Sequence, residues 1–218
     1  MKLYNMNLSN FASKCRLVIY EKGAKVDVVP IPGNDLKSPE YLKIYPFGKT
    51  PSLQTDDGQM IGESEIINEY LEEKFPTPSL LPKDAEGRAR TRAFSRFHDL
   101  YLEPPIRALF PQAQSKEKDR KLIDEKVGEI KARLDQLEGM LSGKACAAGE
   151  QFTLADCAIV PTMFFANLLL PMLGAPAPLE GRPKLAAWWE SVQKRPSVQK
   201  VLGEQQQALM QLQQQQQR

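Results

Sequence analysis

The first 75 residues change hydrophobic period several times. Short apolar runs of strand type occupy 1–6 and 26–31, and apolar residues at helical spacing occupy 11–22 between them. Ser38-Pro39 then predicts the start of a short helix, because Ser is a favoured N-cap and Pro suits the first helical turn. An Asp-Gly turn joins two further short strands, 51–53 and 60–61. A helix follows from Glu63, with four residues expected to face inward: Ile66, Ile67, Tyr70 and Leu71.

Beyond a proline-dense stretch at 75–82, all apolar patterns are helical. One helix is predicted at 88–103 and stopped by Pro104-Pro105, and a long amphipathic helix at 116–141. Thr153 and Asp156 predict a capping box before an apolar helix that we expect to be the buried core of this part. Two short helices, 185–194 and 198–202, follow.

The order βαβ-α-ββα matches a thioredoxin-like domain. The sequence therefore predicts an α/β N-terminal thioredoxin-like domain plus an all-α C-terminal helical bundle. The expected limits are 1–75, a linker at 76–84, the helical domain at 85–202 and a glutamine-rich tail at 203–218. This tail can extend the last helix or be disordered, and we favour fraying.

Composition excludes several classes of function. The net charge of +2, from 29 basic and 27 acidic residues, offers no bulk field for nucleic acid. No apolar run suits a membrane span, and the chain enters a strand pattern without a signal peptide. Three cysteines lie far apart without a CxxC pair, which favours reduced thiols in a cytoplasm. With one histidine, no metal site is expected.

The stretch 46–53 carries the strongest chemical signal. Gly48-Lys49-Thr50 looks like the end of a phosphate loop, but Lys43 stands where that loop needs Gly, and a strand rather than a helix follows. What remains is a hairpin opened by Pro51, which cannot donate a ladder hydrogen bond. The backbone of Thr50 is therefore left to pair with an extended peptide ligand.

This stretch resembles the glutathione-binding loop of the cytosolic glutathione transferases, Asn-Pro-x-Gly-x-Val-Pro-x-Leu, with Tyr45 for Asn and Thr50 for Val. Leu80-Leu81-Pro82 and the segment 152–156 match the same family, so the resemblance covers roughly residues 1–202. It implies a cis Thr50-Pro51 bond and backbone pairing of Thr50 with the cysteinyl unit of glutathione, the co-substrate.

Ser9 lies between the first strand and the first helix, where N–H donors at a helix start favour a thiolate. The segment 9–16 resembles the motif Ser-Pro-Phe-Ser-x-x-x-Arg of serine-type, bacterial-like transferases, although it lacks the proline and the second serine. The resemblance implies that Ser9 stabilises the thiolate. A plain N-cap is the alternative, Ser13 is the rival hydroxyl, and Cys15 fits a core thiol.

Glu63 and Ser64 align with the acid–serine pair that holds the γ-glutamyl group in this family, although they can simply cap the following helix. Lys37 and Lys49 match basic positions that bind the glycyl carboxylate, and each is equally a candidate for a solvated lysine. Candidates for a second-substrate pocket are Met6, Phe11, Tyr101, Arg107 and Phe110, for which core packing explains the aromatic residues equally well.

The first hypothesis is therefore a cytoplasmic glutathione transferase that conjugates the thiolate to a small electrophile, as in detoxification. The alternatives are a non-catalytic transferase-like scaffold, or a glutathione-dependent isomerase or peroxidase. No motif suggests a hydrolase, and His98 and Asp99 read best as an ordinary polar face, though an acid near here reaches the partner subunit's glutathione in some classes.

A homodimer is also expected from the resemblance. Basic residues on the helix from 88 and acidic residues on the helix from 63 could steer two subunits together, although intrachain pairing or solvation explains them as well. These residues are Arg88, Arg90, Arg92 and Arg96, and Glu65, Glu69, Glu72 and Glu73.

Overall fold

The structure is a computed structural model that describes residues 1–216. The chain divides into two compact units: Met1–Leu80 with the chain from Pro196 onward, and Leu81–Arg195. The first holds the sheet and the second is helical, which confirms the predicted fold class. The structure differs from the sequence-based limits in grouping 196–202 with the first unit, so those domain limits stay a prediction.

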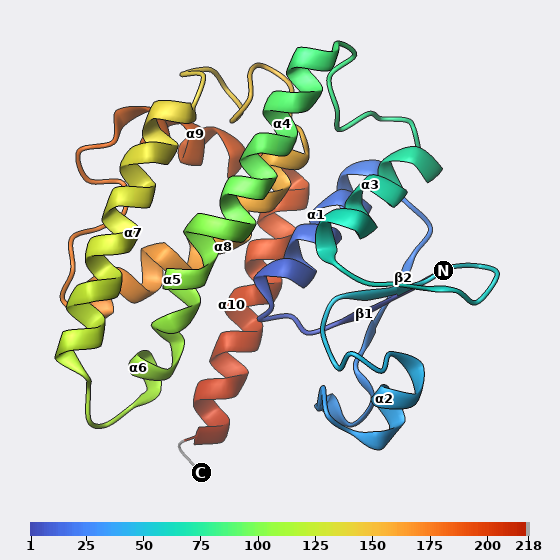
Figure 1. The fold of residues 1–218 in the computed structure, drawn as a ribbon, viewed down its shortest axis with the longest axis horizontal. Helices are drawn as coiled ribbons and strands as arrows, with labels where there is room; N and C mark the ends of the chain where they lie inside the picture. Colours follow the sequence, from blue (N-terminus) through green and yellow to red (C-terminus); the bar gives the residue numbers. More distant parts are fainter. Residues whose placement is uncertain (217–218) are drawn as a thin grey trace. The chain divides into compact units, whose positions relative to one another are not determined.

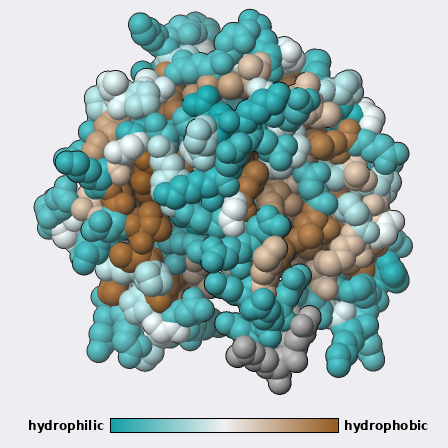
Figure 2. Space-filling view, turned by 180° about the vertical axis from the view of Figure 1, so that it is seen from behind, coloured by the Kyte–Doolittle hydropathy of each residue, from teal (hydrophilic) through white to brown (hydrophobic). Residues whose placement is uncertain are grey.

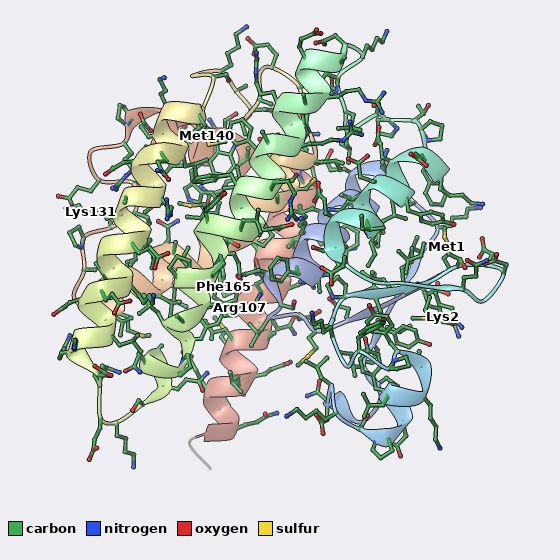
Figure 3. The ribbon with its side chains drawn as sticks, in the orientation of Figure 1. Met1, Lys2, Arg107, Lys131, Met140 and Phe165 are labelled. Carbon is green, nitrogen blue, oxygen red and sulfur yellow. The ribbon has the colours of Figure 1, made fainter. Side chains whose placement is uncertain are left out.

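The first unit is built on a four-stranded mixed sheet of order β2-β1-β3-β4 (Figure 1). Its strands are β1 (Lys2–Asn5), β2 (Asp27–Pro30), β3 (Ser52–Gln54) and β4 (Met60–Ile61). β1 runs parallel to β2 and antiparallel to β3, and β4 returns antiparallel to β3. Met1 anchors the hairpin between β3 and β4, because its amino group pairs with Asp56 at 2.7 Å (Figure 3).

Helices cover the sheet on both sides. The helical elements of this unit are α1 (Asn10–Lys22), the short η1 (Pro32–Asn34), α2 (Pro39–Ile44), α3 (Ser64–Lys74) and α10 (Pro196–Gln216), which packs against α1. Figure 1 shows α1 and α3 on one side of the sheet and α2 on the other. On the side of α2, three tyrosines and one isoleucine form a buried cluster: Tyr4, Ile31, Tyr41 and Tyr45.

The inward face of α3 was predicted only in part. Ile67 and Leu71 are buried, but Ile66 is 58% exposed and Tyr70 is only half-buried. Ser64, Asn68 and Glu72 complete the buried face instead. The reason is ionic: buried lysines of α1 hold two carboxylates of α3, in the pairs Lys14–Glu65 at 2.6 Å and Lys22–Glu72 at 2.5 Å.

The expectation that the glutamine-rich tail frays is wrong for 205–216, which continue α10; the last two residues lie outside the described part. Gln, Leu, Met and Ala are good helix formers, which favours this continuation. The helix is also held to α1, because Glu204 accepts hydrogen bonds from Arg16 at 2.7 Å and Tyr20 at 2.9 Å. Gln205 beside it is fully buried.

The second unit contains only helices among its described elements. They are α4 (Ala85–Phe97), the π-helical turn η2 (His98–Leu102), α5 (Glu103–Ala108), α6 (Phe110–Gln114), α7 (Arg120–Met140), α8 (Leu154–Met172) and α9 (Pro183–Val192). The predicted stop at Pro104-Pro105 is wrong: both prolines lie in the first turn of α5, where a missing N–H is tolerated. The hydrogen-bond pattern instead changes earlier, to the π-helical turn η2.

α8 is the buried helix that the sequence predicts for this unit. Its capping box forms, with the Thr153 N–H donating to the Asp156 carboxylate at 2.9 Å. Asp156 is fully buried and also accepts from the Ala147 N–H and from Trp188 Nε1, both at 2.8 Å. α8 is long and apolar enough to cross a membrane, but 78% of its most apolar window is buried, as in a core helix.

Candidate glutathione site

The strand order brings three chain segments to the same end of the sheet. β1 ends at Asn5, and its antiparallel neighbour β3 begins at Ser52, so these two strand termini lie side by side. β4 is antiparallel to β3 and therefore terminates at the same end of the sheet, just before α3. Ser9, Thr50-Pro51 and Glu63-Ser64 thus follow or precede strand ends that meet at one place, as the sequence hypothesis requires.

Ser9 is the N-cap of α1. Its Oγ accepts a hydrogen bond from the Ala12 N–H at 3.2 Å, and its backbone is extended, with φ −81° and ψ 120°. Among residues 1–216, no acceptor takes the hydroxyl hydrogen of Ser9. A hydroxyl donates once and accepts through two lone pairs. The capping role therefore leaves the donor available to a thiolate, and the two interpretations of Ser9 are compatible.

Ser13, the rival hydroxyl, is occupied. It is fully buried and accepts from Arg16 Nη2 at 2.6 Å, and its own hydrogen points to the Asn7 carbonyl at 3.5 Å. Cys15 is also fully buried, with Sγ 3.5 Å from the Ser64 carbonyl oxygen. This burial agrees with the expected core thiol and leaves Ser9 as the better hydroxyl at this end of the sheet.

The Thr50-Pro51 bond is cis, as the resemblance implied. The ladder between β1 and β3 starts only at Ser52, and within the described chain the Thr50 backbone N–H and C=O have no partner. Tyr41 holds this loop from below: its hydroxyl donates to the Lys49 carbonyl at 2.6 Å and lies 2.9 Å from Ser52 Oγ. The Thr50 N–H and C=O, in a loop that the Tyr41 side chain holds in place, can therefore pair with a peptide ligand.

Gly48 gives this loop its shape. Its φ of +56° is unfavourable for residues with a side chain, and a Cβ there would lie 2.9 Å from the Leu36 carbonyl oxygen. The loop therefore requires glycine at this position.

Glu63 does not cap α3 with its side chain. It occupies the N-cap position with φ +60°, but its carboxylate makes no capping hydrogen bond and is 73% exposed. A non-glycine residue with positive φ stores backbone strain, which is typical of binding sites. Lys49 Nζ is 4.0 Å from Glu63 Oε1, so these two predicted ligand residues lie together. Ser64 begins α3 and is buried.

Lys37, by contrast, is exposed, and its backbone N–H donates to Asp35 Oδ1 at 2.9 Å. Leu36, the residue before Lys37, lies against the loop that carries Lys49, because its carbonyl oxygen would be 2.9 Å from a Cβ at Gly48. The role of Lys37 stays a prediction.

Tyr45 was noted in the sequence only as a departure from the family motif, but the structure gives it a place at the site. It is 8% exposed, and its hydroxyl lies so close over Gly62 that a Cβ there would clash with it at 1.7 Å. Burial raises the pKa of Tyr45, and the neighbouring Glu63 carboxylate raises it further. Tyr45 thus packs against the segment between β4 and α3 that carries Glu63. The glycine at position 62 is the sequence feature from which this close approach could have been predicted.

Comparison with known proteins decides the family. The family models "Glutathione S-transferase, N-terminal domain" and "Glutathione S-transferase, C-terminal domain" match residues 3–79 and 97–196. Glutathione S-transferase F10 of Arabidopsis thaliana is 32% identical over 202 residues, which cover 88% of this chain and 92% of that protein. The chain belongs to the glutathione S-transferase family.

Two further relatives agree with this assignment. Maleylacetoacetate isomerase of Pseudomonas aeruginosa is 31% identical over 176 residues, covering 77% of this chain and 82% of that protein. The solved structure of glutathione S-transferase-I bound with lactoylglutathione has a TM-score of 0.77 and 28% identity, with 93% of this chain and 98% of that chain covered. The predicted transferase activity with glutathione as co-substrate is thereby confirmed, whereas the serine-type assignment stays a prediction.

The predicted second-substrate residues lie in different local surroundings. Met6 packs against the tyrosine cluster of the first unit. Tyr101 lines an open hollow of about 450 Å³ with Phe97, Arg133, Gln136, Gly139 and Met140, and Figure 3 shows Met140 on the side of α7 that faces α4. Arg107 pairs with Glu103 at 2.9 Å, and the Phe110 ring lies 5.0 Å from the Phe165 ring. That hollow includes neither Arg107 nor Phe110, so a shared pocket with Phe11 stays a prediction.

His98 is committed to the interior of the second unit. It is fully buried, with Nδ1 2.8 Å from Asp99 Oδ1 and Nε2 2.6 Å from Thr162 Oγ1. Both ring nitrogens are therefore engaged, and the expectation that His98 lies on an ordinary polar face is wrong. No group of three or more potential metal ligands occurs within residues 1–216.

Proposed function

We propose that Ser9 is the residue by which this transferase activates glutathione. The observation that carries the proposal is the Ser9 hydroxyl, which caps α1 as an acceptor and keeps its hydrogen for an outside acceptor. A hydrogen bond to the sulfur and the N–H groups at the helix start both favour the thiolate. The thiol loses its proton to solvent, the sulfur then forms a bond to an electrophilic carbon, and the leaving group departs with its electron pair.

The remaining site residues hold the ends of the tripeptide. The Thr50 backbone beside Pro51 pairs with the cysteinyl unit, and Glu63 binds the γ-glutamyl ammonium. Ser64 and the first N–H groups of α3 bind its carboxylate. Lys49 receives the glycyl carboxylate, with Lys37 as a second candidate. The exposure of Glu63 and Lys49, at 73% and 71%, supports this assignment, because both charges remain accessible to a ligand.

Binding and turnover test the proposal together. The protein should be retained on immobilised glutathione, should conjugate a small aromatic halide, and should lower the pKa of the bound thiol below that of free glutathione. Retention without conjugation of any halide, epoxide or unsaturated carbonyl would instead favour a binding module.

Isomerisation is the second candidate, favoured by the similarity to maleylacetoacetate isomerase. The Ser-Ser-Cys start of that class is absent here, because Asn10 and Phe11 follow Ser9. A cis-unsaturated diacid incubated with catalytic glutathione separates the two: isomerisation returns glutathione unchanged, whereas conjugation consumes it.

A cytoplasmic homodimer is the assembly that we propose. The electrostatic argument for it changes, because Glu65 and Glu72 already pair with Lys14 and Lys22 in their own chain. Large apolar side chains are exposed instead, and Figure 2 shows hydrophobic surface in separate areas on one face. Light scattering at low micromolar protein should give about twice 24.6 kDa in low salt and in 1 M salt alike. A monomer mass in both would contradict the dimer, and dissociation by salt alone would restore the charge-based account.

A further inference from the structure

Arg16 is the centre of a buried network behind the loop that carries Ser9. The side chain is 1% exposed. Nη1 donates to Asn7 Oδ1 at 2.8 Å, and Nη2 donates to the Asn7 carbonyl at 3.0 Å and to Ser13 Oγ at 2.6 Å. Asn5 Nδ2 also donates to Asn7 Oδ1, at 2.7 Å. Asn7, two residues before Ser9, is thus fixed through both its backbone and its side chain.

The Arg16 guanidinium also pairs with a residue of α10. Glu204 Oε2 lies 2.7 Å from Arg16 Nη1, and Tyr20 donates to Glu204 Oε1 at 2.9 Å. Burial lowers the pKa of Arg16, and the Glu204 carboxylate opposes that shift. A buried guanidinium without a counter-charge is costly, so Glu204 permits Arg16 to remain at this place. Glu204 lies beyond residues 97–196, the part of the helical region that the family model matches.

A bidentate arginine fixes geometry more strictly than a single contact does, because its planar fork presents several donors in a rigid arrangement. Here the fork joins α1 and α10 to the loop between β1 and α1, and Ser9 continues that loop with its N–H bonded to the Met6 carbonyl at 2.9 Å. Movement of Asn7 would therefore move Ser9 relative to the thiol.

We propose that Arg16, held in place by Glu204 of α10, is a positioning residue for Ser9. Within residues 1–216 its side chain makes no hydrogen bond or ion pair with a predicted ligand residue, so it acts on the reaction through the loop. The inference rests on the proposed role of Ser9. It gives α10 a part in catalysis, because a glutamate near the end of the chain supports the loop that presents the hydroxyl.

A double-mutant cycle between Arg16 and Ser9 tests this inference. Arg16→Lys keeps the charge but loses the fork, and should lower kcat on the order of 10-fold, as a misplaced catalytic group does. The KM for glutathione should stay unchanged, because Thr50, Glu63 and Ser64 keep their places. In the Ser9→Ala background the same change should cost no more than about twofold, since both residues act through one hydrogen bond.

Glu204 offers an independent approach from α10. Glu204→Ala should lower kcat in the same Ser9-dependent way, and Glu204→Gln, which keeps an acceptor for Arg16, should restore most of the loss. Lys22→Gln is the matched control, because it breaks a buried ion pair at the far end of the same helix. It should lower the melting temperature and leave kcat as in the wild type.

The outcomes separate the two proposals. If Ser9→Ala lowers kcat and the Arg16 effect adds fully to it, the proposed function stands and the positioning role is overturned. If Ser9→Ala changes neither kcat nor the bound-thiol pKa, both are overturned. If only melting temperatures change in the Arg16 and Glu204 variants, the network is structural and the inference fails.

Discussion

Removing the Ser9 hydroxyl should raise the pKa of bound glutathione and slow its reaction. The change Ser9→Ala deletes one donor to a charged sulfur, and a hydrogen bond to a charged group contributes about 1.5–3 kcal/mol. One pKa unit corresponds to about 1.36 kcal/mol. The thiol pKa should therefore rise by about 1–2 units, and turnover below that pKa should fall by roughly 10- to 150-fold.

The pH profile distinguishes this mechanism from general damage. Once pH rises above the variant's thiol pKa, the bound thiol is fully ionised again, and a thiolate of higher pKa is also the better nucleophile. The rate deficit should therefore shrink as pH rises through that pKa. The assay is thiolate absorbance of the binary complex, followed by turnover with an aromatic halide across the same pH range. A deficit of equal size at every pH would refute thiolate stabilisation as the role of Ser9.

The capping role of Ser9 needs its own control, because Ser9→Ala also removes the hydrogen bond to the Ala12 N–H. That loss should cost about 1 kcal/mol of stability. Asp119 caps α7 in the same way, accepting from the Leu122 N–H at 3.0 Å. Asp119→Ala should therefore destabilise the protein to a similar degree without changing the thiol pKa. If Ser9→Ala changes stability alone, like this control, the assignment of Ser9 is refuted.

Three other changes test the rest of the structure. Glu63→Gln should weaken glutathione affinity by calorimetry with little change in melting temperature, because the exposed carboxylate caps nothing; proportional losses of both would favour a structural role. Gly48→Ala should raise the KM for glutathione by distorting the loop, with kcat less affected, and an unchanged KM would contradict the need for glycine. Asp156→Ala should cost at least about 3 kcal/mol in urea unfolding, because three buried N–H donors lose their acceptor; a cost below about 1 kcal/mol would contradict this.

The sequence predicted what depends on local chemistry. Ser9, Ser38 and Thr153 were recognised at helix starts because capping uses neighbouring atoms, and all three occupy those places. Pro51 and the Asp-Gly turn predicted the hairpin in the same way. The exposure of Ile66 was not predicted, because helical spacing indicates which residues share a face but not which element packs against that face. Two buried lysines of α1 determine which face of α3 is turned inward, and the sequence around Ile66 gives no sign of these lysines.

Long-range polar contacts explain why the residues that support the Ser9 loop were not predicted, whereas the candidate ligand residues were. Arg16 and Glu204 are 188 residues apart, and each alone looks like a solvated charge on an amphipathic helix. The prediction that the tail frays followed from its glutamine-rich composition and its place at the end of the chain. The buried guanidinium gives α10 a reason to reach Glu204, the residue just before the glutamine run. A cation fixed behind the serine loop requires an anion, and α10 must extend at least to Glu204 to provide it.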